Sequence, residues 1–181
     1  MLTALGFFAH VSTCLADDKV KKLTNSNVKS FIESTTDITT GNSERLSTKK
    51  IQTYLDRHIS NKARFKSVMK YNIPNMPPQE ATLTLDKDEF MSSVNEGAEK
   101  ITGYETLVEI KEIKIASSGE KAFVKTESTE YATMAVPSQS GGSEDVPMEG
   151  VSECTQIISL NRGTIQMYSA NCITEINFLE Y

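Results

Sequence analysis

Two cysteines, Cys154 and Cys172, have the spacing that most directly suggests chemistry. They begin and end the sequence CTQIISLNRGTIQMYSANC, in which two alternating stretches are joined by an Asn-Arg-Gly turn. Paired thiols can bind a metal, exchange electrons or hold each other in a structural disulfide. A zinc site usually takes four Cys or His ligands. Because the chain after residue 16 contains only two Cys and one His, we predict no bound metal.

A disulfide is the interpretation that this hairpin favours. Redox-active cysteines usually lie close in sequence near the start of a helix, whereas these two lie on neighbouring predicted strands. If residues 162–164 form the loop, Cys154 falls directly opposite Cys172, and a one-residue change in the turn removes that register. We therefore predict a bond between Cys154 and Cys172, in an oxidising compartment.

His58, in the sequence YLDRHIS, is a candidate general base. A catalytic imidazole needs a partner that fixes its tautomer, and Asp56 is the nearest acid in the sequence. On a helix, however, residues two positions apart point about 200° away from each other around the axis, so the side chains of Asp56 and His58 cannot meet. We predict that His58 packs at the edge of a helical core face.

Tyrosines and glutamates provide a second set of candidates for a polar pocket. Tyr71 and Tyr131 could line such a pocket with His58, and Glu127 or Glu130 could be its acid. The other tyrosines with this potential are Tyr54, Tyr104 and Tyr168. Tyrosine is also common on half-buried strands, because the ring packs while the hydroxyl reaches water. The candidate pocket is therefore His58, Tyr71, Glu127 and Tyr131, and no residue is predicted to be catalytic.

Motifs that bind cofactors or mark common active sites are missing from the sequence. The chain contains no CxxC, no HExxH, no Gly-rich phosphate loop and no serine elbow. We predict no cofactor. The net charge of −5 and the lack of a basic stripe also argue against nucleic acid as a partner.

The first sixteen residues, MLTALGFFAHVSTCLA, carry no charged side chain, and charges begin abruptly at DDKVKK. Their apolar run is shorter than the roughly 20 residues that span a bilayer as a helix. We predict a signal peptide over residues 1–16, cleaved after Ala16, although the usual positive start is missing. A lipoprotein attached through Cys14 is the alternative.

Residues 17–181 are long enough for one domain with a sizeable core. No second long apolar run follows, so we expect the cleaved product to be soluble and periplasmic or secreted. The absence of an Asn-x-Ser/Thr acceptor favours a bacterial periplasm over a eukaryotic secretory route.

Two amphipathic helices are predicted first, followed by a strand pair and a third helix. The first helix begins at a cap at Asn25 or Ser26 and ends at Gly41, and the second follows the sequence GNSER. Alternation predicts strands over residues 63–73 and 81–85. The third helix should begin with a capping box between Asp86 and Glu89 and end at Gly103.

Four long antiparallel strands are predicted after the third helix, over about 104–116, 120–136, 150–160 and 164–178. The apolar residues of the first change parity halfway, which predicts a bulge near Lys111 and Glu112. Segment 137–150 is rich in Gly, Ser, Pro and acids, and we expect a mobile, exposed loop there.

This order of elements resembles the nuclear transport factor 2-like fold, which is also found in SnoaL-like polyketide cyclases and ketosteroid isomerases and shares parts with cystatin-like domains. The resemblance covers nearly all of residues 17–181 and rests on element order and length. It implies an α+β fold in which three N-terminal helices pack on a strongly bent, mostly antiparallel sheet that forms a cone. A pocket would lie between the helices and the concave face.

Proteins of that fold include isomerases, dehydratases and binding modules without chemistry, so the fold does not decide the function. We predict an exported, non-catalytic module that binds a small ligand or a protein and forms a homodimer through the outer sheet face. Two alternatives remain open. One is a small isomerase or dehydratase that uses a pocket carboxylate and a tyrosine, and the other is a structural subunit of a cell-envelope assembly.

Overall fold

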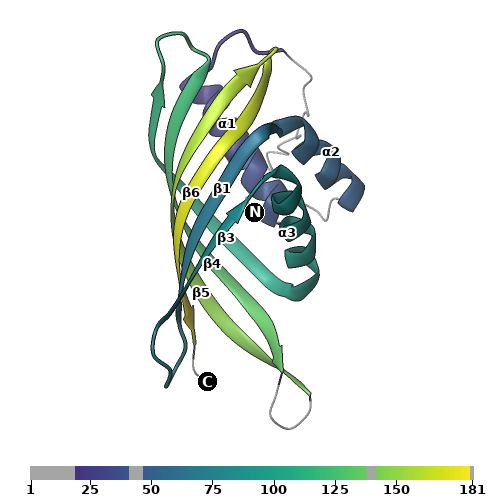
Figure 1. The fold of residues 1–181 in the computed structure, drawn as a ribbon, viewed down its shortest axis with the longest axis vertical. Helices are drawn as coiled ribbons and strands as arrows, with labels where there is room; N and C mark the ends of the chain where they lie inside the picture. The colour runs from purple at the N-terminus through teal and green to yellow at the C-terminus, as the bar shows by residue number, and fades with distance from the viewer. Residues whose placement is uncertain (1–18, 41–46, 138–141, 180–181) are drawn as a thin grey trace, which may run out of the picture.

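The computed structural model describes residues 19–40, 47–137 and 142–179, which form three helices and one six-stranded sheet (Figure 1). In chain order the elements are α1 (Asn25–Thr40), α2 (Thr48–His58), β1 (Ile59–Asn72), β2 (Gln79–Leu85), α3 (Lys87–Lys100), β3 (Ile101–Ile115), β4 (Lys121–Pro137), β5 (Ser143–Asn161) and β6 (Thr164–Phe178). The α+β class is confirmed. Only α1 and α2 precede the sheet, because α3 follows β2.

The strands are arranged in the order β2-β1-β6-β5-β4-β3. Strands β1 and β6 run parallel, and every other neighbouring pair is antiparallel. The parallel contact joins segments that are far apart in the sequence, so the C-terminal strand lies at the centre of the sheet. The sheet is therefore mixed, with one parallel contact among antiparallel ones.

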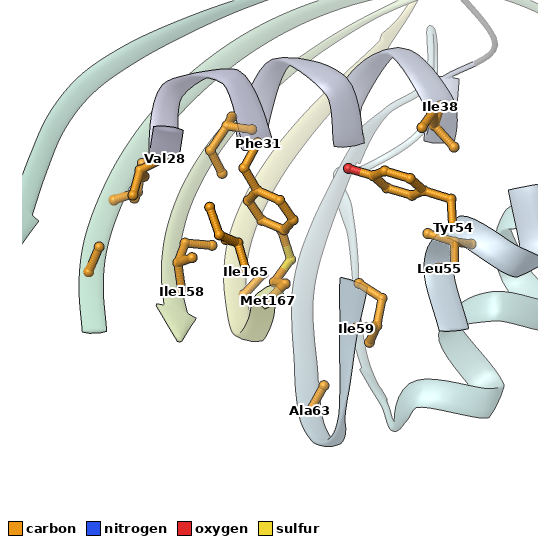
Figure 2. Close-up of a cluster of buried hydrophobic side chains, with 14 of the residues drawn as sticks. Val28, Phe31, Ile38, Tyr54, Leu55, Ile59, Ala63, Ile158, Ile165 and Met167 are labelled. Carbon is orange, nitrogen blue, oxygen red and sulfur yellow. The ribbon is translucent and has the colours of Figure 1, made fainter. Parts of the chain in front are cut away.

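The helices cover one face of the sheet, which we call the inner face (Figure 1). Figure 2 shows Phe31 of α1 above sheet residues that include Ile165 and Met167, and Leu55 of α2 above Ile59 at the start of β1. Leu55 and Ile158 are completely buried. Burying one such aliphatic side chain stabilises the fold by about 1.5–3 kcal/mol relative to exposing it, so this cluster holds the helices on the sheet.

Helices α1 and α3 both begin with reciprocal side-chain caps. The predicted box at α3 is confirmed, since the Asp86 amide donates to Glu89 Oε2 (2.9 Å) and the Glu89 amide donates to Asp86 Oδ1 (3.1 Å). At α1 the cap is Thr24, one residue before the predicted positions, with its Oγ1 accepting from the Asn27 amide at 3.2 Å. The Thr24 amide donates to Asn27 Oδ1 at 2.8 Å.

A short segment before α1 crosses two hairpin turns of the sheet. The Val20 amide donates to the Gly163 carbonyl at 2.9 Å, and the Leu23 amide donates to the Gly119 carbonyl at 2.7 Å. Leu23 is buried in the core. A methyl group at Gly163 would lie 2.9 Å from Cβ of Lys19, so this glycine allows the close approach.

Two predicted boundaries are wrong. Gly103 does not end α3, because the helix stops at Lys100 and β3 begins at Ile101. The predicted loop 137–150 is strand over 143–150, which pairs with β4 as far as Pro137 opposite Ser143. Polar residues suit the end of a long exposed hairpin as well as a loop, so composition could not separate the two. The signal peptide 1–16, Gly41 and residues 138–141 lie outside the described residues.

The predicted bulge in β3 is confirmed, because its pairing with β4 shifts between Ile110 and Glu112. Lys111 is the extra residue. This shift allows Ile110 and Ile113 to contribute to the same core despite their opposite parity in the sequence.

Cys154 lies directly opposite Cys172, with their Cα atoms 4.1 Å apart and their Sγ atoms 2.06 Å apart, so the predicted disulfide is confirmed. The reason differs from the one expected. The turn is a two-residue one at Arg162 and Gly163, whose φ angles of 51° and 85° fit the tight hairpin type. That turn alone would place Cys154 opposite Asn171. An extra residue at Tyr168, where the register shifts, restores the cysteine pair.

Candidate functional site

The inner face can be followed residue by residue from Phe65, whose ring stacks on Phe90 of α3 with centroids 4.2 Å apart. Residues directly opposite each other share a face, and the face alternates along each strand. Phe65 is opposite Ala170, which is opposite Gln156, which is opposite Val124. Steps of two along these strands therefore give the rest of the inner face.

Hydroxyl, amide and carboxylate groups occupy this face beyond the apolar core. We call this set the inner polar patch: Thr126, Ser128, Glu130, Ser152, Gln156 and Thr174. The Cys154–Cys172 disulfide lies among these residues, on the same face. All six side chains are buried or half-buried. A buried polar surface of this kind is costly unless its groups are satisfied.

The patch satisfies many of its own hydrogen bonds. The hydroxyls of Ser152 and Thr174 lie 2.8 Å apart across β5 and β6. The Gln156 amide donates to Thr126 Oγ1 at 3.2 Å. Gln156 is 9% exposed, and its Oε1 has no hydrogen-bond partner. A buried acceptor without a partner costs about 1–3 kcal/mol, so Gln156 is incompletely satisfied by the described residues.

Glu130 is the acid of the patch. The Ser128 hydroxyl donates to its Oε1 at 3.2 Å. Gly150 lies directly opposite on β5, and a Cβ atom there would be 3.8 Å from Glu130 Oε2. A side chain at Gly150 would therefore be in van der Waals contact with this carboxylate, and the glycine leaves that contact unmade.

His58 is half-buried and packs at the edge of the apolar core, the position that its place on the helix predicts. Its ring is 4.4 Å from the Tyr54 ring and 5.8 Å from the Phe31 ring, measured between centroids. Its Nδ1 lies 2.9 Å from the Ile165 carbonyl oxygen, which only accepts, so Nδ1 carries the proton. Burial and the nearby Arg57 charge lower the pKa of His58, against the opposing effect of the Ile165 carbonyl.

The acid that the sequence places nearest His58 turns elsewhere. Asp56 forms an ion pair with Lys87 at 3.1 Å. Tyr54 lies beside His58, but its hydroxyl is 2.9 Å from Thr35 Oγ1, and burial raises the pKa of Tyr54. Figure 2 shows this hydroxyl directed at α1. Among the residues that the structure describes, His58 therefore has packing partners and no carboxylate partner.

The other three candidate pocket residues do not converge with His58. Tyr71 is on the inner face, where its hydroxyl contacts Met69 Sδ at 3.3 Å. Glu127 is on the opposite, outer face and forms an ion pair with Lys111 at 3.4 Å. Tyr131 is also on the outer face, is 42% exposed, and has its pKa raised by a hydrogen bond to Glu149.

The inner polar patch was not predicted from the sequence, because most of its residues are hydroxyl and amide types that do not by themselves indicate a site. The available signal was parity: Thr126, Ser128 and Glu130 continue the alternation that begins with buried Ala122 and Val124. Hydroxyl residues at core-facing positions are informative because buried polar groups are uncommon. Glu130 and Glu127 were alternatives for the pocket acid. They differ in parity along β4, which places Glu130 on the inner face and Glu127 on the outer face.

The outer face has a separate hollow of about 740 Å³. Side chains around it include Lys66, Lys125, Glu127, Glu153, Asn171 and Ile173. Oppositely charged residues alternate here, and Ile173 is 50% exposed.

Within the described part of the chain, no three His, Cys, Asp or Glu residues are placed to hold a metal, and no helix there is long and apolar enough to cross a membrane.

The sequence matches no protein-family model and no curated protein. Among solved structures, a putative scytalone dehydratase from Novosphingobium aromaticivorans is similar with a TM-score of 0.55 and 11% identity, over 85% of this chain and 86% of that chain. A type 2 hexachlorocyclohexane dehydrochlorinase, LinA, is similar with a TM-score of 0.54 and 6% identity, over 86% of this chain and 90% of that chain. A conserved protein from Planctomyces limnophilus is similar with a TM-score of 0.51 and 14% identity, over 85% of this chain and 99% of that chain.

These similarities establish the fold. The chain has the cone fold of nuclear transport factor 2-like, SnoaL-like and cystatin-like proteins, so the resemblance drawn from element order is confirmed. At such low identity the functions of the similar proteins do not transfer.

Proposed function

We propose that the protein is an exported module that binds a small ligand against the inner polar patch without transforming it. The observation that carries the proposal is the separation of the patch from His58. The patch offers hydroxyls, an amide and Glu130, whereas the imidazole is enclosed between aromatic rings with its Nδ1 proton on a backbone carbonyl. Binding needs placed polar groups, but general acid–base catalysis also needs a base within reach of the substrate.

Export is supported by two independent features. The uncharged start of the sequence fits a signal peptide, and a disulfide persists best in an oxidising compartment such as the periplasm or the extracellular space. Intact mass of protein recovered from the periplasm or medium of a bacterial host should correspond to a chain that begins at Asp17. Full-length product that stays in the cytoplasm would contradict export.

Native mass spectrometry of protein purified from its own host tests the binding proposal. We expect a noncovalent adduct of small mass on the wild type and a weaker adduct on Thr126→Val, which removes the hydroxyl that accepts from Gln156. Thr155→Val is the matched control, because Thr155 lies on the outer face of β5. Apo protein alone, or equal loss from both variants, would argue against the inner polar patch as the binding site.

An enzyme is the second candidate, and Glu130 is the observation that favours it. A half-buried carboxylate on the inner face could remove a proton from a bound substrate. The similar structures named as a dehydratase and a dehydrochlorinase add support to an elimination reaction. A turnover that falls about a hundredfold or more in Glu130→Gln, with unchanged folding, would replace the binding module by this enzyme.

The predicted homodimer through the outer face is retained as part of the proposal. The outer face carries both signs of charge, with Arg64, Lys66 and Lys70 on β1, Lys125 on β4 and the acids Glu127 and Glu153 on β4 and β5. A two-fold axis can place the basic residues of one copy against the acids of the other, and unlike charges facing each other favour association. Light scattering after gel filtration should give twice the chain mass, and a monomer at all concentrations would exclude the dimer.

A further inference from the structure

Among the inner-face positions of the sheet whose side chains the structure describes, Glu130 is the only charged one. Every other such position from Gln79 on β2 to Thr106 on β3 is apolar, a hydroxyl, an amide, a glycine or a cysteine of the disulfide. No lysine, arginine or histidine of the described chain forms an ion pair with this carboxylate, which is half-buried. The contrast is with Glu127, three residues earlier, whose charge is met by Lys111.

A half-buried carboxylate with a single hydroxyl donor is incompletely stabilised. Ser128 supplies one hydrogen bond, while an ionised carboxylate can accept about four. Removing such a charge from water is unfavourable unless a cation or several donors approach it. Glu130 therefore favours a ligand that brings a positive charge and more than one N–H group.

The surroundings of Glu130 also suit the carbon part of such a ligand. Gly150 places no side chain on the β5 side, and Ile176 lies beyond it on β6. Val108, 36% exposed, lies on the β3 side opposite Ser128. Apolar groups on both sides of one carboxylate match a molecule with an ammonium head and a short hydrocarbon body.

We propose that the inner polar patch binds a small organic ammonium ion, with the ammonium group on Glu130 and the hydrocarbon part over Gly150 toward Ile176. This inference rests on the proposed binding function and names its ligand class. An anionic ligand would be repelled by the Glu130 carboxylate. An uncharged ligand would bring no positive charge to stabilise that carboxylate. Opposite charge is thus the feature that selects among ligands of equal size.

Isothermal titration calorimetry with three probes of equal chain length tests the inference: n-hexylammonium, n-hexanol and hexanoate. The wild type should bind hexylammonium most tightly, and binding should weaken as NaCl is raised, because salt screens the ion pair. Glu130→Gln should weaken hexylammonium binding about tenfold or more, the scale of one lost charge-assisted contact. Glu130→Asp retains the charge and should bind hexylammonium better than Glu130→Gln does.

Glu153→Gln is the matched control, because it removes one negative charge from the outer face of the neighbouring strand. It should change the affinity by less than about twofold, since an exposed charge at that distance is screened. Equal weakening by Glu130→Gln and Glu153→Gln would overturn the inference, and so would hexanol or hexanoate binding as tightly as hexylammonium. Tight hexanol binding would still leave the proposed binding function standing. No binding of any probe, with no adduct in native mass spectrometry, would overturn both.

Discussion

The inner face has two halves that share strands and periodicity but differ in composition. Near the hairpin turns it carries Ala122, Val124 and Ile158, which are almost completely buried beneath the helices. Farther along the same strands it carries the hydroxyls of Thr126 and Ser152 and their neighbours in the inner polar patch. The change occurs within about two residues of β4 and β5.

This difference separates folding from function. The apolar half excludes water and needs no partner beyond the helices, so its composition is explained by stability alone. The polar half stabilises the fold less per residue and retains a half-buried acid without an ion pair. Residues that are poorly explained by stability are the better candidates for binding.

Truncating the apolar half should have the largest effect. Ile158→Ala removes a fully buried side chain from β5 and should lower the free energy of unfolding by about 2–5 kcal/mol. Urea denaturation followed by circular dichroism measures this loss. A loss below about 1 kcal/mol would show that the apolar half is not the main source of stability.

Removing the disulfide should have the next largest effect. Replacing both Cys154 and Cys172 by Ser opens a loop with a sequence separation of 18, and the chain-entropy model assigns such a loop roughly 3 kcal/mol. The comparison is between oxidised wild type and the double variant in the same urea series. Equal stability of the two would mean that the bond does not constrain the unfolded chain.

The extra residue at Tyr168 gives a sharper test of why the cysteines meet. Deleting Tyr168 should give an unbroken ladder from the tight turn onward, in which Ile157 still pairs with Ser169 and Cys154 stays opposite Cys172. Neither thiol should then react with an alkylating agent in protein purified without reductant. Labelling of both thiols would contradict this register and show that the bulge itself is needed to bring the cysteines together.

A change inside the polar half should affect stability only modestly. Ser152→Ala leaves the Thr174 hydroxyl without its 2.8 Å partner and should cost about 1 kcal/mol. Replacing both residues, with Thr174→Val added, should recover part of that loss because no hydroxyl is then left unpaired. Equal or greater loss in the double variant would contradict this explanation.

The smallest effect expected is the pH dependence due to His58. Burial lowers its pKa in the folded protein below the ordinary value of 6.5, so the unfolded chain binds the proton more readily. Stability should therefore be full above pH 6.5 and should fall as the pH drops below it. His58→Gln should remove this dependence and cost about 1 kcal/mol or less at pH 8. If His58→Gln keeps the wild-type pH profile, the pH dependence of stability is due to other groups.

The sequence predicted the order of the elements well, because each rests on a local pattern. Helical spacing identified α1 and α2, alternation identified the long strands, and the capping box at Asp86 located the start of α3. The resemblance to the cone fold followed from this order. The Cys154–Cys172 pair was also predicted, although through an assumed loop that the structure replaces by a tight turn and a bulge at Tyr168.

The candidate site was less predictable, for two physical reasons. Which face a strand residue occupies depends on register and on bulges, and these are set by pairing between distant segments. Glu127 and Tyr131 were placed in the pocket for their chemistry, and parity puts both outside it. The parallel contact of β1 with β6, which brings Tyr71 to the inner face near the centre of the sheet, has no local signal at all.

Methyl NMR with a fragment library tests most directly the claim that the inner polar patch, and not the outer hollow, is the binding site. Thr126, Thr174 and Ile176 carry methyl groups on the inner face, whereas Val68 and Ile173 carry them on the outer face. Bound fragments should shift the inner methyl signals and leave the outer ones unchanged. Shifts concentrated on Val68 and Ile173 would contradict it and would assign binding to the outer hollow.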